Sequence, residues 1–276
     1  MGDITRAIII VPHQDDEMFI FHRLRALIGQ DVEVHVAWVT DGAAHDQELR
    51  RDIAIRLFFP ILVRSDNDTI RHVREQESTR LMQHLGIAPE RLTFLAHPSG
   101  RIQKCFHALV DDLQQICADL KPQQIYTVAF DHSHFEHDAC NAAVTLAAPR
   151  QATLYEFPVL SLTHGLGRYR WLAPYPGATT RRTPFSRREE QLRLRLFRQV
   201  FRSQWSVALL EQLSSLLPSH YRSLGEPYRI MPAYDYSRPA PGLLPRYVPK
   251  SLTFEDFRQM VQPLLAGRGA TPWDGP

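Results

Sequence analysis

The stretch that decides the fold reads Ala7-Ile-Ile-Ile-Val-Pro-His13-Gln-Asp15-Asp16-Glu17. Its apolar, β-branched first half predicts a short buried strand, which ends at Pro12 because proline has no N–H to donate to a sheet. From Met18 onward the apolar residues recur at helical spacing. The stretch is therefore a strand-to-helix turn that carries one imidazole and three carboxylates. In an open α/β sheet such turns lie at the carboxyl ends of the strands, where ligands bind.

The residue types in this turn suit a divalent metal. His13 and Asp16 are three residues apart on a turn entering a helix, so their side chains can converge on one ion such as zinc, iron(II), manganese or cobalt. Asp15 cannot share that direction, which leaves it free to act as general base on a metal-bound water. Taken alone, the turn also fits an acidic helix start favoured by the helix dipole, with His13 merely nearby.

A second polar cluster favours the metal site. Residues 131–138, Asp-His-Ser-His-Phe-Glu-His-Asp, follow another buried strand and precede a helix of small residues. The sheet can bring the two turns together, and His137 then supplies a third ligand and leaves one position open for water, as in catalytic zinc sites. His134 is placed to donate a proton to a leaving amine or to polarise an oxyanion.

Both turns resemble the signatures of one family. The segment Pro12–Glu17 is similar to the Pro/Ala-His-Pro-Asp-Asp-Glu motif of the LmbE-like, or PIG-L, zinc-dependent N-deacetylases, and His134-Phe-Glu-His137 is similar to that family's His-Pro-Asp-His. Lesser matches are Val39-Thr-Asp-Gly42 and Arg74-Glu-Gln-Glu77, the latter followed by Leu-Gly-Ile. The resemblance covers roughly residues 5–160.

The resemblance implies a role for each matched position. It implies His13, Asp16 and His137 as metal ligands, Asp15 as general base, His134 as acid or oxyanion stabiliser, and Arg74 as a contact to sugar hydroxyls. It also implies one zinc ion per chain, with iron(II) or another divalent metal as the alternative. Gln14 replaces the family's usual proline, and Phe135-Glu136 replaces Pro-Asp, but neither change removes a ligand.

Three other polar residues follow predicted strands. Asp41 and His97 stand at strand ends and are therefore further candidates for substrate binding. His132 is an additional titratable group to which the sequence assigns no role.

The alternation of strand and helix patterns predicts a three-layer, Rossmann-like α/β domain with a mainly parallel sheet. Residues 1–160 are expected to form the catalytic core, and residues 161–276 a C-terminal elaboration of the same domain, made of helices and loops that shape the substrate cleft. No Gly-x-Gly-x-x-Gly follows a strand, which argues against a dehydrogenase.

Several segments carry local expectations. Residues 47–59 are predicted to be helical, residues 61–70 a loop, and a helix is expected from Arg71 to Leu85. The segment 171–184 is expected to form loops that cover the site. Aromatic and histidine side chains there and just before it fit either sugar stacking or packing beneath a loop: His164, Tyr169, Trp171 and Tyr175.

The C-terminal part shows fewer signals. Ser186 and Glu189 predict a capping box that opens a long helix. Beyond Pro218, only one further helix is expected, at residues 254–265.

Composition excludes several classes of protein. Hydrophobic residues make up 44% of the chain and charged residues 22%, which is ordinary for a globular protein. No run reaches the length of a membrane span, and the N-terminus does not resemble a signal peptide. Three cysteines without a Cys-x-x-Cys motif fit free thiols in a reducing compartment, so cytoplasm is expected. A nucleic-acid-binding protein would normally show a basic stripe with interleaved aromatic residues, which this sequence lacks. The expected partner is a small-molecule amino sugar.

These patterns predict metal-dependent hydrolysis of the acetamide of an N-acetyl amino sugar of the N-acetylglucosamine type, or of its conjugate. An amidase acting on another N-acyl small molecule, such as a thiol conjugate, is an alternative. A catalytically silent sugar-binding relative is another, although the intact ligand set and Asp15 count against it. Metal-free nucleotide binding is disfavoured because the glycine-rich turn is missing.

Overall fold

The computed structural model describes residues 4–45, 60–159, 171–215 and 225–267. Its centre is a seven-stranded sheet in the order β3-β2-β1-β4-β5-β7-β6. The strands are β1 (Arg6–Val11), β2 (Glu33–Thr40), β3 (Leu92–His97), β4 (Gln124–Val128), β5 (Thr153–Phe157), β6 (Thr180–Thr183) and β7 (Glu226–Ile230). Strands β1 to β5 pair in parallel, whereas β7 pairs antiparallel with both β5 and β6. The expected mainly parallel sheet is confirmed.

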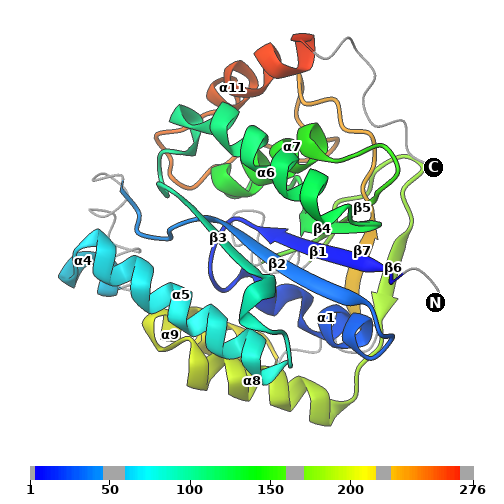
Figure 1. Cartoon of the computed structure of the whole chain (residues 1–276). Coiled ribbons are helices and arrows are strands. Elements are labelled where there is room, and N and C mark those ends of the chain that lie inside the picture. The colour runs from blue at the N-terminus through cyan, green and yellow to red at the C-terminus, as the bar shows by residue number, and fades with distance from the viewer. Residues whose placement is uncertain (1–3, 46–59, 160–170, 216–224, 268–276) are drawn as a thin grey trace.

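Helices cover both faces of this sheet and make three layers (Figure 1). One face carries α6 (Phe106–Leu120), α7 (Phe135–Ala147) and α11 (Phe254–Gly267). The other carries α1 (Phe21–Ile28), α4 (Ile61–Arg64), α5 (Asn67–His84), α8 (Arg187–Val200) and α9 (Trp205–Ser214). Short 3-10 turns occupy Asp16–Ile20, Pro89–Arg91, Ile102–Lys104 and Arg202–Gln204. Among the described helices, none is long and apolar enough to cross a membrane.

The central strand β1 is buried on both faces, which explains its uninterrupted apolar sequence. From Ala7 to Val11, no side chain is more than 1% exposed. Its neighbours are β2 on one side and β4 on the other, so the strand order reverses between β1 and β4. This reversal is the topological switch point, where a crevice opens at the carboxyl ends of the strands.

The helices before β3 differ in part from the expectation. Residues 61–70 are not a loop, because α4 begins at Ile61 and α5 at Asn67. The start of α5 is set by Asp66, whose carboxylate accepts a hydrogen bond from the Thr69 N–H at 2.8 Å and so caps the helix. The predicted helix over residues 47–59 lies outside the described residues.

The C-terminal part contains two strands that were not predicted, and the first of them, β6, lies in the segment 171–184 that was expected to form loops. Strands β6 and β7 extend the sheet at its β5 edge as an antiparallel pair. Both are short, and Pro227 and the exposed Arg181 and Arg182 hide the alternation that usually reveals a strand. The capping box of Ser186 and Glu189 at the start of α8 is confirmed, as is the last helix, α11.

Candidate metal centre and active site

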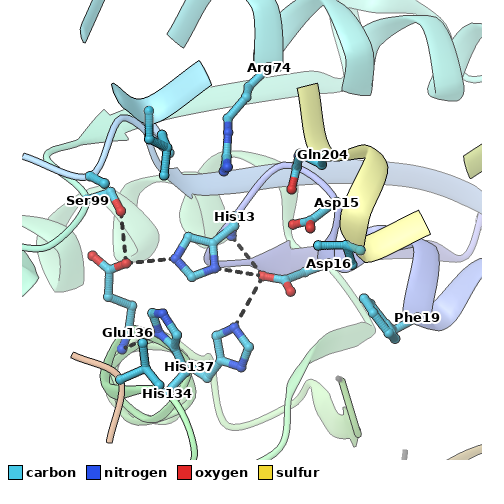
Figure 2. Close-up of a pocket in the computed structure, with 15 residues that line it drawn as sticks. His13, Asp15, Asp16, Phe19, Arg74, Ser99, His134, Glu136, His137 and Gln204 are labelled. Atoms are coloured by element: carbon cyan, nitrogen blue, oxygen red, sulfur yellow. Dashed lines mark hydrogen bonds and ion pairs between the residues drawn. The ribbon is translucent and has the colours of Figure 1, made fainter. Parts of the chain in front are cut away.

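The two polar turns meet at the switch point. Strands β1 and β4 are adjacent and parallel, with Ala7 opposite Gln124 and Ile10 opposite Thr127. The turn after β1 carries His13 to Glu17, and the turn after β4 carries Asp131 to His137. Figure 2 shows the imidazoles and carboxylates of the two turns directed toward one another.

The first turn contains a strained residue and is held in place by hydrogen bonds to Glu17. Asp15 has φ 144°, a conformation that costs a non-glycine residue free energy unless its surroundings hold it. Its N–H donates to Oε2 of Glu17 at 2.9 Å, and the same oxygen accepts a hydrogen bond from Nε1 of Trp38 at 3.0 Å. Oε1 of Glu17 accepts from the Ser78 hydroxyl at 2.6 Å. Glu17, to which the sequence assigned no role, thus ties the turn to β2 and α5.

The second turn directs three side chains through a helix start. Helix α7 begins at Phe135, earlier than the predicted small-residue helix, because His134 serves as its N-cap. The backbone N–H of Glu136 donates to Nδ1 of His134 at 3.2 Å. This hydrogen bond places the proton of a neutral His134 on Nε2. Glu136 and His137 consequently lie in the first helical turn, facing the first motif.

The predicted ligand residues converge. Oδ2 of Asp16 lies 3.2 Å from Nδ1 of His13 and 3.6 Å from Nε2 of His137. One ligand atom from each of the three lies within 4.8 Å of the others, and a second overlapping group consists of His13, His134 and Glu136. His137 is buried, and its Nδ1 has no hydrogen-bond partner among the described residues. Imidazole nitrogens and a carboxylate oxygen in this arrangement fit a divalent cation of the zinc type.

Glu136 is a site residue that the sequence did not single out. Its Oε2 lies 2.7 Å from Nε2 of His13 and accepts from the Ser99 hydroxyl, and its Oε1 accepts from the Gly100 N–H. Burial opposes charge on His13, but hydrogen bonds to Asp16 and Glu136 raise its pKa to about 10. Metal-binding histidines usually donate their second nitrogen to such a carboxylate. The available signal was position, because Glu136 stands where the family motif has aspartate.

Asp15 lines the same pocket without belonging to the converging ligand set. Its side chain is only about a tenth exposed, and Figure 2 shows it next to Asp16 and Gln204. Burial and the neighbouring Asp16 raise the pKa of the Asp15 carboxyl well above its usual range, while Arg74 and His13 oppose that rise. A carboxylate with a raised pKa is a stronger base than an ordinary one.

Arg74 reaches the pocket from α5 across Gly42. Gly42 has φ +64°, and a Cβ there would lie 2.7 Å from Cδ and Nη1 of Arg74 and 2.6 Å from Oε1 of Gln14. Only glycine therefore fits beneath this arginine. Arg74 is 5% exposed, and its Nε has no hydrogen-bond partner within the described ranges. A contact of Arg74 to a sugar hydroxyl stays a prediction.

Asp41 and His97 are not brought into the pocket. Oδ1 of Asp41 accepts from the backbone N–H groups of Ala43 and Ser99, so this carboxylate supports the loops beside the pocket. Nε2 of His97 pairs with Oδ2 of Asp112 at 2.9 Å. A role in substrate binding stays a prediction for both residues.

The pocket has a volume of about 210 Å³. Four apolar side chains that sequence reasoning missed also line it: Phe19, Leu62, Val207 and Val248. The two predicted aromatic residues that the structure describes, Trp171 and Tyr175, do not line it. The hydroxyl of Tyr175 donates to the Ala233 carbonyl, so Tyr175 packs beneath a loop, and Trp171 also lies outside the pocket lining. His164 and Tyr169 fall outside the described residues.

The C-terminal segment 240–248 holds the second turn in place. Nε2 of His132 accepts from the Ala240 N–H at 2.7 Å, and Nδ1 pairs with Oδ2 of Asp138 at 2.8 Å. The Tyr247 hydroxyl donates to the same Asp138 oxygen at 2.8 Å. The Val248 N–H donates to the Ser133 carbonyl at 3.1 Å. His132 therefore has a structural role, anchoring the turn that carries His134 and His137.

Fold and pocket together define a Rossmann-like α/β protein with a pocket at the switch point of its sheet, where histidine and aspartate side chains converge in an arrangement that fits a divalent cation. The chain belongs to the PIG-L family: the family model "PIG-L: GlcNAc-PI de-N-acetylase" matches residues 8–148. This confirms the resemblance of the two motifs. No curated protein matches the chain.

Solved structures share the fold at low identity. A zinc-inhibited form of the teicoplanin deacetylase Orf2 is 18% identical, with a TM-score of 0.60, covering 82% of this chain and 97% of that one. The N,N'-diacetylchitobiose deacetylase from Pyrococcus horikoshii is 17% identical, with a TM-score of 0.55, covering 83% and 85%. The 4-carboxy-2-hydroxymuconate hydratase GalB from Pseudomonas putida KT2440 is 11% identical, with a TM-score of 0.51, covering 84% and 98%. The last shows that the fold alone does not fix the reaction.

Proposed function

We propose that this protein is a metal-dependent N-deacetylase that hydrolyses the acetamide of an N-acetyl amino sugar, or of a conjugate of such a sugar. The observation that carries the proposal is the convergence of His13, Asp16 and His137 beside the carboxyl of Asp15. Membership of the PIG-L family and the shared fold of two deacetylases support it.

The bound cation is proposed to be zinc, with iron(II) or another divalent metal as the alternative. His13, Asp16 and His137 would hold it, and Glu136 would orient His13 through Nε2. A divalent cation there lowers the pKa of a water molecule and polarises an amide carbonyl. One related structure is a zinc-inhibited form, so the assay must titrate the metal as well as supply it.

The remaining chemistry comes from side chains of the two turns. Asp15 takes the proton of the attacking water, because its raised pKa makes it a competent base. Burial lowers the pKa of His134 well below its usual value, so its ring is neutral at neutral pH. With the proton on Nε2, His134 donates a hydrogen bond to the developing oxyanion. Asp15, which carries the proton taken from the water, then supplies that proton to the leaving amine. Arg74 is assigned to a sugar hydroxyl.

The test is release of free amine from N-acetylglucosamine compounds after chelation and stepwise return of zinc or iron(II). We expect release that depends on added metal, with inhibition by excess zinc as a further outcome to record. Silence across the compounds with metal still bound would overturn the sugar deacetylase and leave an amidase for other N-acyl molecules. Silence without bound metal would overturn the catalytic proposal.

A further inference from the structure

The catalytic pocket is too small to enclose a conjugate. Its volume of about 210 Å³ lies below the range of roughly 300–1,000 Å³ typical of clefts that surround a whole drug-sized ligand. An N-acetyl group and the sugar that carries it would fill this space. Any group attached to the sugar must therefore extend out of the pocket, so the surface next to the pocket selects among conjugates.

A second cavity shares a lining residue with this pocket. Val248 lines the catalytic pocket and also a cavity of about 730 Å³ formed by residues 245–255, here named the 245–255 cavity. The Phe135 N–H donates to the Val248 carbonyl at 3.2 Å, and the Val248 N–H donates to the Ser133 carbonyl at 3.1 Å. The backbone that borders the second cavity is thus hydrogen-bonded on both sides of His134, which fixes the two cavities relative to one another.

The lining of the 245–255 cavity combines apolar groups with positive charge. Its apolar side chains include Tyr247, Leu252 and Phe254. Two cations, Arg246 and Lys250, also line it, and both are exposed. The acid in the lining, Glu255, is engaged by Arg258 at 2.6 Å from outside the cavity. The cavity therefore favours an apolar, ring-shaped group that carries a negative charge.

We propose that the 245–255 cavity is the subsite for the group attached to the amino sugar, and that this group is aromatic and anionic. The proposal rests on the proposed deacetylase function and adds the class of conjugate. The cavity lies wholly beyond residues 8–148, the span matched by the family model, so it is a property of this chain's C-terminal segment.

Three probes separate the contributions: N-acetylglucosamine, its phenyl β-glycoside and its 4-carboxyphenyl β-glycoside. Burying the phenyl ring should raise kcat/KM over the free sugar by about tenfold. The added carboxylate should raise it further by about two- to fivefold, the range of a solvent-exposed ion pair. This second increment should shrink at high salt.

Variants assign each increment to its side chains. Leu252→Trp fills the cavity and should bring the phenyl-to-free-sugar ratio of kcat/KM close to one. Lys250→Glu should bring the carboxyphenyl-to-phenyl ratio below one, while Lys121→Glu is the matched control. Lys121 directly follows α6 and precedes β4, so it lies near the amino ends of the strands, whereas the site lies at their carboxyl ends. The Lys121→Glu variant should therefore leave both ratios unchanged.

The outcomes distinguish the two proposals. No amine from any of the three probes, with metal bound, would overturn the deacetylase function. Equal kcat/KM for all three probes would overturn the subsite while the function stands. A phenyl increment that survives Leu252→Trp, or a carboxylate increment that survives Lys250→Glu, would also overturn the subsite.

Discussion

The turn after β1 and the turn after β4 supply one ligand set, but they are held by different parts of the chain. The first is braced by Glu17, which is bound to Trp38 and Ser78 of the central fold. The second is braced by His132 and Asp138, which are bound to the C-terminal segment 240–248. The family-matched span, residues 8–148, therefore contains every proposed ligand but not the C-terminal contacts that fix the turn of His137.

The largest effects should come from removing one ligand of each turn. We expect His13→Ala and His137→Ala each to abolish stable metal binding and to lower kcat/KM by more than the roughly 100-fold typical of losing an outer partner. Metal content by mass spectrometry and kcat/KM on the same preparations measure this. Full metal retention in His137→Ala would show that His137 is not a ligand.

Chemistry can be separated from metal binding in both turns. Asp15→Asn and His134→Gln should lower kcat by about 10²- to 10⁴-fold with unchanged metal content, because each removes a proton-transfer or oxyanion-stabilising group. Single-turnover rates and metal content on each variant test this. An Asp15→Asn enzyme with wild-type kcat would refute its assignment as general base.

The brace of the first turn should be sensitive to pH. Burial raises the pKa of Glu17 from 4.5 to about 7, so its contribution to stability is full below pH 4.5 and is lost as pH rises through about 7. Glu17→Gln cannot ionise, and its amide can still accept from Asp15 and donate to Ser78. We expect this variant to gain about 3 kcal/mol over the wild type between pH 4.5 and pH 8. Unfolding curves of both chelated proteins at the two pH values decide it, and a constant difference would contradict the expectation.

The brace of the second turn should show a smaller effect with a specific signature. Tyr247→Phe removes the hydrogen bond to Asp138 and should cost about 1.5–3 kcal/mol of unfolding free energy and also lower kcat, because the turn of His134 loosens. Tyr236→Phe is the matched control, since Tyr236 is buried and its hydroxyl donates to Asn141. The control should lose stability without losing kcat. An equal loss of kcat in Tyr247→Phe and Tyr236→Phe would contradict a specific role of Tyr247 in holding the turn of His134.

The sequence was informative where a strand and the polar turn after it are formed by consecutive residues. β1 is an uninterrupted apolar run that ends in polar residues, so the strand and the turn with His13, Asp15 and Asp16 were both visible. His137 followed from the same pattern after β4. The cap of α5 by Asp66 is a local signal as well, but it was missed because it lies in a polar stretch that resembles a loop.

Long-range pairs were not predictable in the same way. Glu136 contacts His13 across 123 residues, and that pairing depends on β1 and β4 being neighbours in the sheet. Strand β7 is short, contains Pro227, and is defined only by its partners β5 and β6. Val248 lines the pocket because its backbone pairs with the turn of Ser133, which no local pattern reveals.

The hydrogen bond between His132 and Ala240 joins residues 108 positions apart. During synthesis it therefore forms only after the chain has been extended past Ala240. A chain leaving the ribosome exposes His13, Asp16 and His137 long before the segment that fixes the second turn has been made. Under the proposed function, capture of the cation is therefore expected to be a late step in maturation, because an unfinished chain carries the proposed ligands without a finished site. A premature stop before Ala240 would yield a protein silenced with its two motifs intact.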